Sequence, residues 1–231
     1  MKKWIIAGCL MFIFADCCAQ KVKRSMFKLP LVILPAPSDQ DMPLVLSITG
    51  DGGWVGFDRK LAKQFTGEKV PVVALNSFRY FMKKKTPEQT AAAIAELLHH
   101  YMKQMDRNSF ILEGYSFGAD VVPFVFNRLP PDLLQQCRGV ALFSPGTSTD
   151  FKIRALQMMG TRHKWKYNVV SEIKAMKTFH TLFFFGEKEH KFPLRIISKP
   201  GWQLVYLKGG HTYAKEKGNV GKMVLDGLGI E

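Results

Sequence analysis

The sequence predicts an α/β fold in which helices cover both faces of a mostly parallel sheet. Seven short apolar runs alternate with helical patterns at the intervals of βαβ units. Several runs are apolar on both faces, as parallel strands between two layers of helices are. The chain has 231 residues, of which 47% are hydrophobic and 23% charged, a balance that indicates a folded globular protein and excludes a disordered or collagen-like one.

Residues 1–19 have the pattern of a signal peptide. Two lysines precede a 12-residue apolar run, Trp4 to Ala15, and Ala19 stands at a small-residue cleavage site. The run is too short to cross a hydrocarbon core, which needs about 20 helical residues. We therefore expect export, cleavage after Ala19 and a single domain over residues 20–231. A lipoprotein is the less favoured alternative, since Cys9 ends a lipobox-like pattern.

The apolar runs are expected to form the strands of the sheet. In chain order they are Leu29–Leu34, Leu44–Thr49, Val70–Leu75, Phe110–Glu113, Gly139–Phe143, Phe179–Phe185 and Gln203–Leu207. Before the fourth run, Thr86 is a good N-cap, Pro87 suits the first helical position and Gln89 completes a capping box. A long helix is therefore predicted to begin there, with an apolar stripe that reaches Met105.

The chain is strongly basic, with 33 Lys and Arg against 19 Asp and Glu and a formal net charge of +14. This charge predicts an anionic partner such as a membrane surface or a nucleic acid, and export favours the membrane surface. No nucleic acid is expected. The basic segment from Phe151 to Lys177 is either a solvated helical face or a small cap that contacts the membrane. The predicted fold otherwise has minimal or no cap.

A nucleophile motif, G-x-S-x-G, occupies residues 114–118. It follows the predicted strand that ends at Glu113, and a helix is predicted from Phe117 onward, which is the context that the motif requires. The glycines let neighbouring backbone pass close to a tight turn, and the start of the helix directs its positive end at a developing oxyanion. Ser116 is therefore the candidate nucleophile, and the backbone N–H of Phe117 is a candidate oxyanion donor.

A glycine-rich turn, Thr49 to Trp54, follows the second predicted strand. In folds that use such a nucleophile motif, this position supplies the second oxyanion donor, here the backbone N–H of Asp51. A dinucleotide-binding loop is a competing interpretation. It fails because the G-x-G-x-x-G spacing would need a glycine at position 55, which is Val55. A plain tight turn is the remaining alternative.

The candidate base is His211, which follows the last predicted strand in the sequence Gly209-Gly210-His211. The other histidines lack this loop context. No spacing of His and Cys is typical of a metal site, so neither a metal nor another cofactor is expected. A chain order of serine, acid and then histidine is that of the α/β-hydrolases.

The acid of such a triad is expected in the turn after the sixth apolar run. Glu189 stands three residues after Gly186, the usual place for the acid, and is favoured over Glu187. Asp150 is the alternative, because it follows the preceding strand, where some hydrolases keep their acid.

Several blocks of the sequence resemble the VirJ family of bacterial virulence proteins and its relative AcvB. They are Thr49–Trp54, Ser77–Phe81 with Lys83–Thr90, Gly114–Asp120, Asn127–Pro130 and Gly209–His211. The resemblance implies a periplasmic serine hydrolase of the α/β-hydrolase fold. It also implies an aminoacyl-phospholipid substrate such as lysyl-phosphatidylglycerol, and an association with type IV secretion. A non-catalytic periplasmic adaptor, and an esterase or peptidase with a non-lipid substrate, are the alternatives.

Three further residues are candidates for substrate binding. Asp120 lies one helical turn after Ser116 and is either a contact for a cationic head group or an acid at the start of a helix. Arg79 and Tyr80 follow the third predicted strand, on the side of the sheet where ligands bind, and are otherwise loop anchors.

Overall fold

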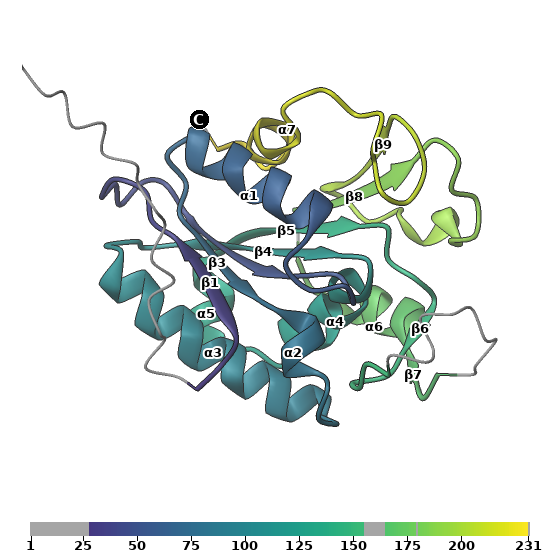
Figure 1. The fold of residues 1–231 in the computed structure, drawn as a ribbon, viewed down its shortest axis with the longest axis horizontal. Helices are drawn as coiled ribbons and strands as arrows, with labels where there is room; N and C mark the ends of the chain where they lie inside the picture. Colours follow the sequence, from purple (N-terminus) through teal and green to yellow (C-terminus); the bar gives the residue numbers. More distant parts are fainter. Residues whose placement is uncertain (1–27, 155–164, 179, 231) are drawn as a thin grey trace, which may run out of the picture.

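The computed structural model describes residues 28–154, 165–178 and 180–230, so the predicted signal peptide lies outside the described residues. At its centre is a seven-stranded sheet in the order β1-β3-β2-β4-β5-β8-β9 (Figure 1). β1 runs antiparallel to β3, and all other neighbours in this sheet are parallel. The strands are β1 Leu31–Leu34, β2 Leu44–Ile48, β3 Val72–Leu75, β4 Phe110–Tyr115, β5 Cys137–Phe143, β8 Thr181–Gly186 and β9 Trp202–Leu207. All seven predicted strands are confirmed, with small shifts at their ends.

Helices cover both faces of this sheet (Figure 1). α1 (Gly56–Gly67) and α7 (Val220–Gly227) pack against each other on one face. α3 (Pro87–Gln104), α4 (Phe117–Phe126) and α6 (Val169–Ala175) lie on the other face. Shorter helices are α2 Ser77–Tyr80, α5 Pro131–Gln136 and the 3₁₀ turn η2 Leu194–Ile196. The predicted α/β fold class is confirmed.

The capping box predicted for α3 is present. Thr86 Oγ1 accepts a hydrogen bond from the N–H of Gln89 at 3.2 Å, and Gln89 Oε1 accepts one from the N–H of Thr86 at 3.1 Å. Ile94, Leu97 and Leu98 of the apolar stripe are fully buried. The cap fixes where the helix starts, and the stripe fixes which side of it faces the sheet.

The central strands are mostly apolar because both of their faces are buried, although β2 also carries the buried Ser47 and β4 the buried Glu113. Along β4, Ile111 belongs to the core layer beneath α1 and α7, whereas Phe110 and Leu112 belong to the layer beneath α3 and α4. Burying a side chain of this size contributes about 2 kcal/mol to stability, which favours apolar side chains on both faces over the polar and apolar alternation of a half-exposed strand.

One excursion leaves the sheet between β5 and β8. It contains a short antiparallel ribbon, β6 (Ser148–Thr149) with β7 (Tyr167–Asn168), followed by α6. Residues 155–164, part of the predicted basic segment, lie outside the description. The ring of Phe151, in this excursion, packs against the ring of Phe81, with the two centroids 5.9 Å apart. The described part of this excursion consists of the ribbon, its flanking residues and α6. Across the described ranges, no helix has both the length and the apolar character needed to cross a membrane.

Candidate active site

Ser116 lies on the sharp turn between β4 and α4. Its backbone has φ 53° and ψ −115°, which non-glycine residues rarely adopt, and its N–H donates to the Phe143 carbonyl oxygen at 2.8 Å. Packing requires both glycines of the motif. A Cβ on Gly118 would lie 1.8 Å from the Ile48 carbonyl oxygen, and one on Gly114 would lie 2.6 Å from Gly118 backbone. The turn therefore holds Ser116 at the carboxyl edge of the sheet.

His211 lies between Ser116 and Glu189. Its Nε2 is 2.8 Å from Ser116 Oγ, and its Nδ1 is 2.7 Å from Glu189 Oε1. Glu189 stands on the turn after β8 and His211 on the loop after β9, so parallel strands bring both loops to the edge that carries Ser116. In this arrangement a carboxylate orients an imidazole, and the imidazole can take a proton from a hydroxyl.

The second carboxylate oxygen of Glu189 is also held. Oε2 accepts hydrogen bonds from Ser144 Oγ at 2.5 Å and from the N–H of Gly186 at 2.7 Å. Partial burial raises the pKa of Glu189, but the hydrogen bonds from Ser144, Gly186 and His211 outweigh it, and the net result is a lowered pKa. Glu189 is therefore an oriented carboxylate at neutral pH.

Three residues that the sequence did not single out support this arrangement. The Tyr213 hydroxyl is hydrogen-bonded to Ser144 Oγ and lies 3.1 Å from the Phe184 carbonyl oxygen. The Tyr115 hydroxyl donates to the His211 carbonyl oxygen at 3.0 Å. Only Tyr115 carried a sequence signal, because it lies within the nucleophile motif. Ser144 and Tyr213 match no motif of their own, and the fold alone brings them together.

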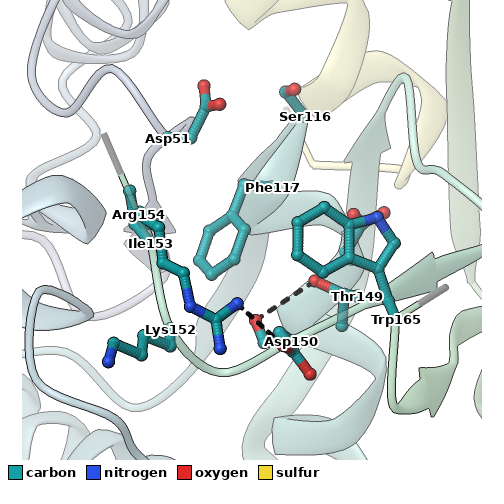
Figure 2. A pocket seen from close by; sticks show the side chains of 10 residues that line it. Asp51, Ser116, Phe117, Thr149, Asp150, Lys152, Ile153, Arg154 and Trp165 are labelled. Carbon is teal, nitrogen blue, oxygen red and sulfur yellow. Dashed lines mark hydrogen bonds and ion pairs between the residues drawn. The ribbon is translucent and has the colours of Figure 1, made fainter. Parts of the chain in front are cut away.

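A cavity of about 170 Å³ opens beside Ser116 (Figure 2). Asp51 and Phe117, the residues predicted to supply the oxyanion donors, both line it. Phe117 is the first residue of α4, so its N–H has no acceptor within the helix. The structure thus brings the two predicted donor positions to the same cavity as the serine hydroxyl.

The carboxyl groups of Asp51, Asp120 and Asp150 border this cavity, and so do the basic side chains of Lys152 and Arg154. Asp120 accepts a hydrogen bond from the N–H of Gly146 at 2.6 Å. Burial raises the pKa of Asp120 to about 8; the bond from Gly146 opposes this rise, and the Asp51 carboxylate adds to it. A cation in the cavity would stabilise both carboxylates and lower that pKa. Asp120 therefore remains a candidate contact for a positively charged group.

Asp150, the alternative acid, lines the same cavity but has other partners. Its Oδ2 accepts a hydrogen bond from Arg154 at 3.4 Å, and its Oδ1 accepts one from the backbone N–H of Lys166 at 3.3 Å (Figure 2 shows the Arg154 pair). Of the two predicted acids, the structure places Glu189 against His211. Among the described residues, no group of three or more His, Cys, Asp and Glu side chains is placed to hold a metal ion.

The structure places Arg79 and Tyr80 away from this cavity. Neither is among the described residues that line it. The ring of Tyr80 is buried in the core, edge-on to Phe81 at a centroid distance of 4.7 Å. Arg79 is exposed on α2, where its backbone N–H donates to Asn76 Oδ1. The alternative, that these two residues anchor a loop, fits the observed contacts.

Two further carboxyl groups are buried beneath the site. Asp58, in α1, accepts a hydrogen bond from the N–H of Gly50 at 3.2 Å on Oδ1, whereas Oδ2 has no partner among the described residues. Burial raises the pKa of Asp58 to about 7 and that of Glu113, on β4, to about 8. Because Gly50 precedes Asp51, Asp58 holds the turn that carries the second predicted oxyanion donor.

These buried carboxyl groups predict that the protein loses stability as the pH rises from about 5 to 7. The folded-state pKa values of Asp58, Glu113 and Asp120 are raised above those of the unfolded chain, so the folded state binds more protons in this window. Each group lowers the free energy of unfolding by up to about 1.4 kcal/mol per pH unit. Urea unfolding across this window measures the slope, which Asp58→Asn should make shallower. A free energy of unfolding that increases with pH would contradict the assignment.

Solved structures of several other proteins are similar to this chain. Est1E from Butyrivibrio proteoclasticus has a TM-score of 0.61 at 13% identity, with 89% of this chain and 94% of that one covered. A proline iminopeptidase from Mycobacterium smegmatis has a TM-score of 0.59 at 11% identity, with 86% and 94% covered. An alpha/beta hydrolase superfamily protein from Enterococcus faecalis has a TM-score of 0.53 at 12% identity, with 86% and 93% covered. At such identities the likeness shows the fold alone, which is the predicted α/β-hydrolase fold.

No curated protein is significantly similar in sequence to this chain. A family is nevertheless identified by sequence, since residues 41–230 match the family described as "Bacterial virulence protein (VirJ)". The match contains both glycine-rich turns, the serine, the acid and the histidine described above. It confirms the resemblance drawn from the sequence blocks, and the chain therefore belongs to the VirJ family of bacterial virulence proteins.

Proposed function

We propose that this protein is a serine hydrolase that cleaves a carboxylic ester through an acyl-enzyme. The observation that carries the proposal is the continuous hydrogen-bonded series from Glu189 through His211 to Ser116, with steps of 2.7 and 2.8 Å. Ser116 is the nucleophile, His211 the general base and then the general acid, and Glu189 the residue that orients the imidazole.

In the first half of the proposed reaction, Ser116 Oγ attacks the ester carbonyl carbon while His211 Nε2 takes the hydroxyl proton. The backbone N–H groups of Phe117 and Asp51 bind the resulting oxyanion. When the tetrahedral intermediate collapses, the alcohol leaves and receives the proton from His211. In the second half, His211 activates a water molecule that attacks the acyl-enzyme, which releases the carboxylic acid and restores the serine.

We further propose that the substrate is the aminoacyl ester of an anionic phospholipid, such as lysyl-phosphatidylglycerol. Membership of the VirJ family supports this class of substrate, and so do the Asp51 and Asp120 carboxyl groups, which offer counter-charge to the ammonium group of an amino acid. The proposed location is the periplasm. Without residues 1–19 the chain has a formal charge of +13, which favours attraction to an anionic membrane, at about 1 kcal/mol per basic residue near the surface. A component of a type IV secretion system is a candidate partner.

Labelling with a fluorophosphonate tests the proposal. The purified protein should be labelled at neutral pH, whereas Ser116→Ala should not, because the reagent needs an activated serine hydroxyl. With vesicles of lysyl-phosphatidylglycerol, the wild-type protein should release free lysine. Labelling without lysine release would favour an esterase or peptidase with a non-lipid substrate. Absence of serine-dependent labelling would reject the hydrolase and favour a non-catalytic adaptor.

A further inference from the structure

A second cavity, of about 430 Å³, borders the acid and the base of the proposed triad. Glu189 and His211 form part of its wall, and three basic side chains, those of Lys188, His190 and Lys191, form another part. Ser116 and the aspartates of the first cavity are not among its described lining residues. His211 thus borders this second cavity, while Ser116, to which its Nε2 is hydrogen-bonded, borders the first one.

We propose that this basic cavity binds the phosphate of the alcohol that leaves the ester. The inference rests on the proposed function and names the chemistry of the leaving group: a glycerol phosphodiester head group. Ser116 borders the first cavity and not this one, and the Asp51 and Asp120 carboxyl groups of the first cavity suit the ammonium group of the amino acid that becomes the acyl group. His211 must reach the leaving oxygen to protonate it, so the alcohol lies beside the imidazole. A phosphate at the other end of a glycerol then extends into the cavity behind His211.

The charge of this cavity favours an anion. Lys188 and Lys191 are exposed and form no ion pair with any residue that the structure describes. The one carboxylate in the wall, Glu189, already accepts hydrogen bonds from Ser144 and Gly186 and contacts His211. The lysine charges are therefore not neutralised within the wall. Lysine is a common ligand for phosphate, with which it forms charge-assisted hydrogen bonds.

The backbone holds the basic turn against the loop that carries the histidine. The N–H of Lys188 donates to the Gly209 carbonyl oxygen at 3.1 Å, and the N–H of Glu189 donates to the Gly186 carbonyl oxygen at 2.8 Å. These two bonds fix the turn next to His211. The backbone that carries the lysines is consequently held beside the proposed leaving group. Less backbone conformational entropy is then lost when the lysines bind an anion.

An apolar wall completes the cavity. Phe185 and Phe192 both line it, with ring centroids 5.2 Å apart, and Pro145 lines it as well. A free inorganic phosphate has no apolar part to place against these rings, whereas the carbon chain of a glycerol head group does. The combination of aromatic wall and lysines therefore favours a head group over the inorganic ion.

Binding of glycerophosphoglycerol, the deacylated head group of phosphatidylglycerol, tests this inference without catalysis. Calorimetric titration of the wild-type protein should show binding that weakens at least about tenfold in the double variant Lys188→Gln/Lys191→Gln, equal to about 1.4 kcal/mol. The matched control, Lys63→Gln/Lys103→Gln, removes the same charge from exposed positions on α1 and α3 and should change the Kd less than about twofold. No binding, an equal loss in the control, or equal or tighter binding of inorganic phosphate would overturn the inference.

A kinetic comparison keeps this result separate from the proposed function. The double variant should lower kcat/KM for lysyl-phosphatidylglycerol at least about tenfold and leave kcat/KM for lysine methyl ester within about twofold, because the methyl ester has no phosphate. Equal losses on both substrates would overturn the inference. If the wild-type protein cleaves neither ester, the proposed function fails, and the titration still decides whether the cavity binds the head group.

Discussion

Replacing Glu189 with glutamine is expected to lower the turnover number by about four orders of magnitude, the usual effect of neutralising a triad acid. Glutamine keeps the size of the side chain but offers His211 Nδ1 an amide, so the imidazole loses both its orientation and the charge that stabilises its protonated form. Because Glu189 does not reach the first cavity, the KM should change little. Steady-state hydrolysis of an activated ester such as p-nitrophenyl acetate measures both quantities.

Two variants control for this effect. Glu187→Gln removes an exposed carboxylate two residues away on the same turn and is expected to keep turnover within about twofold of the wild type, as surface substitutions usually do. Asp150→Asn changes the other candidate acid, whose partners are Arg154 and Lys166. A larger loss of turnover in Asp150→Asn than in Glu189→Gln would show that the acid has been assigned to the wrong loop.

Replacing Gly118 with alanine is expected to destabilise the whole fold. The added Cβ would lie 1.8 Å from the Ile48 carbonyl oxygen and 2.8 Å from that of Thr49, and both are backbone atoms of the central strand region. Overpacking against side chains already costs about 1–3 kcal/mol, and a clash with backbone exceeds this because a strand cannot rotate away. In a domain of this size, that loss corresponds to a Tm lower by about 10 °C or more. Thermal unfolding followed by circular dichroism gives the result.

Gly67→Ala is the matched control for that measurement. Gly67 is the last residue of α1, and a Cβ built on it meets nothing within 4 Å. The Tm of the Gly67→Ala protein is expected to stay within about 2 °C of the wild type or to rise, since alanine favours the helix. A Gly118→Ala protein that unfolds at the wild-type temperature would mean that the contact between β2 and α4 is looser than described.

The strands and the triad serine and histidine were predictable because each has a local signature. β4 and β5 are apolar on both faces, which only a doubly covered strand needs, and Ser116 and His211 stand beside glycines in turns that follow strands. Glu189 was less certain from the sequence, since Asp150 also follows a strand. The contact that separates them, between Glu189 Oε1 and His211 Nδ1, joins residues on different loops.

Other features had no local signature. The hydrogen bonds of Ser144 to Glu189 and Tyr213 join three loops that meet only when β5, β8 and β9 are side by side. Tyr80, in contrast, had a local signature, but it pointed to a different role from the one its contacts indicate. Its position after a strand indicated a ligand contact, but α2 turns its ring into the core beside Phe81, and a four-residue helix has too few positions to reveal its buried side.

The strand order also decides when the site is assembled. Synthesis proceeds from the N-terminus, so the chain delivers the turn after β2 and the serine on β4 well before the strands that carry Glu189 and His211. β9 is the edge strand of the sheet and docks on β8. A nascent chain therefore contains Ser116 before His211 has been made. Any reactivity of Ser116 that depends on His211 therefore requires that β9 has joined the edge of the sheet.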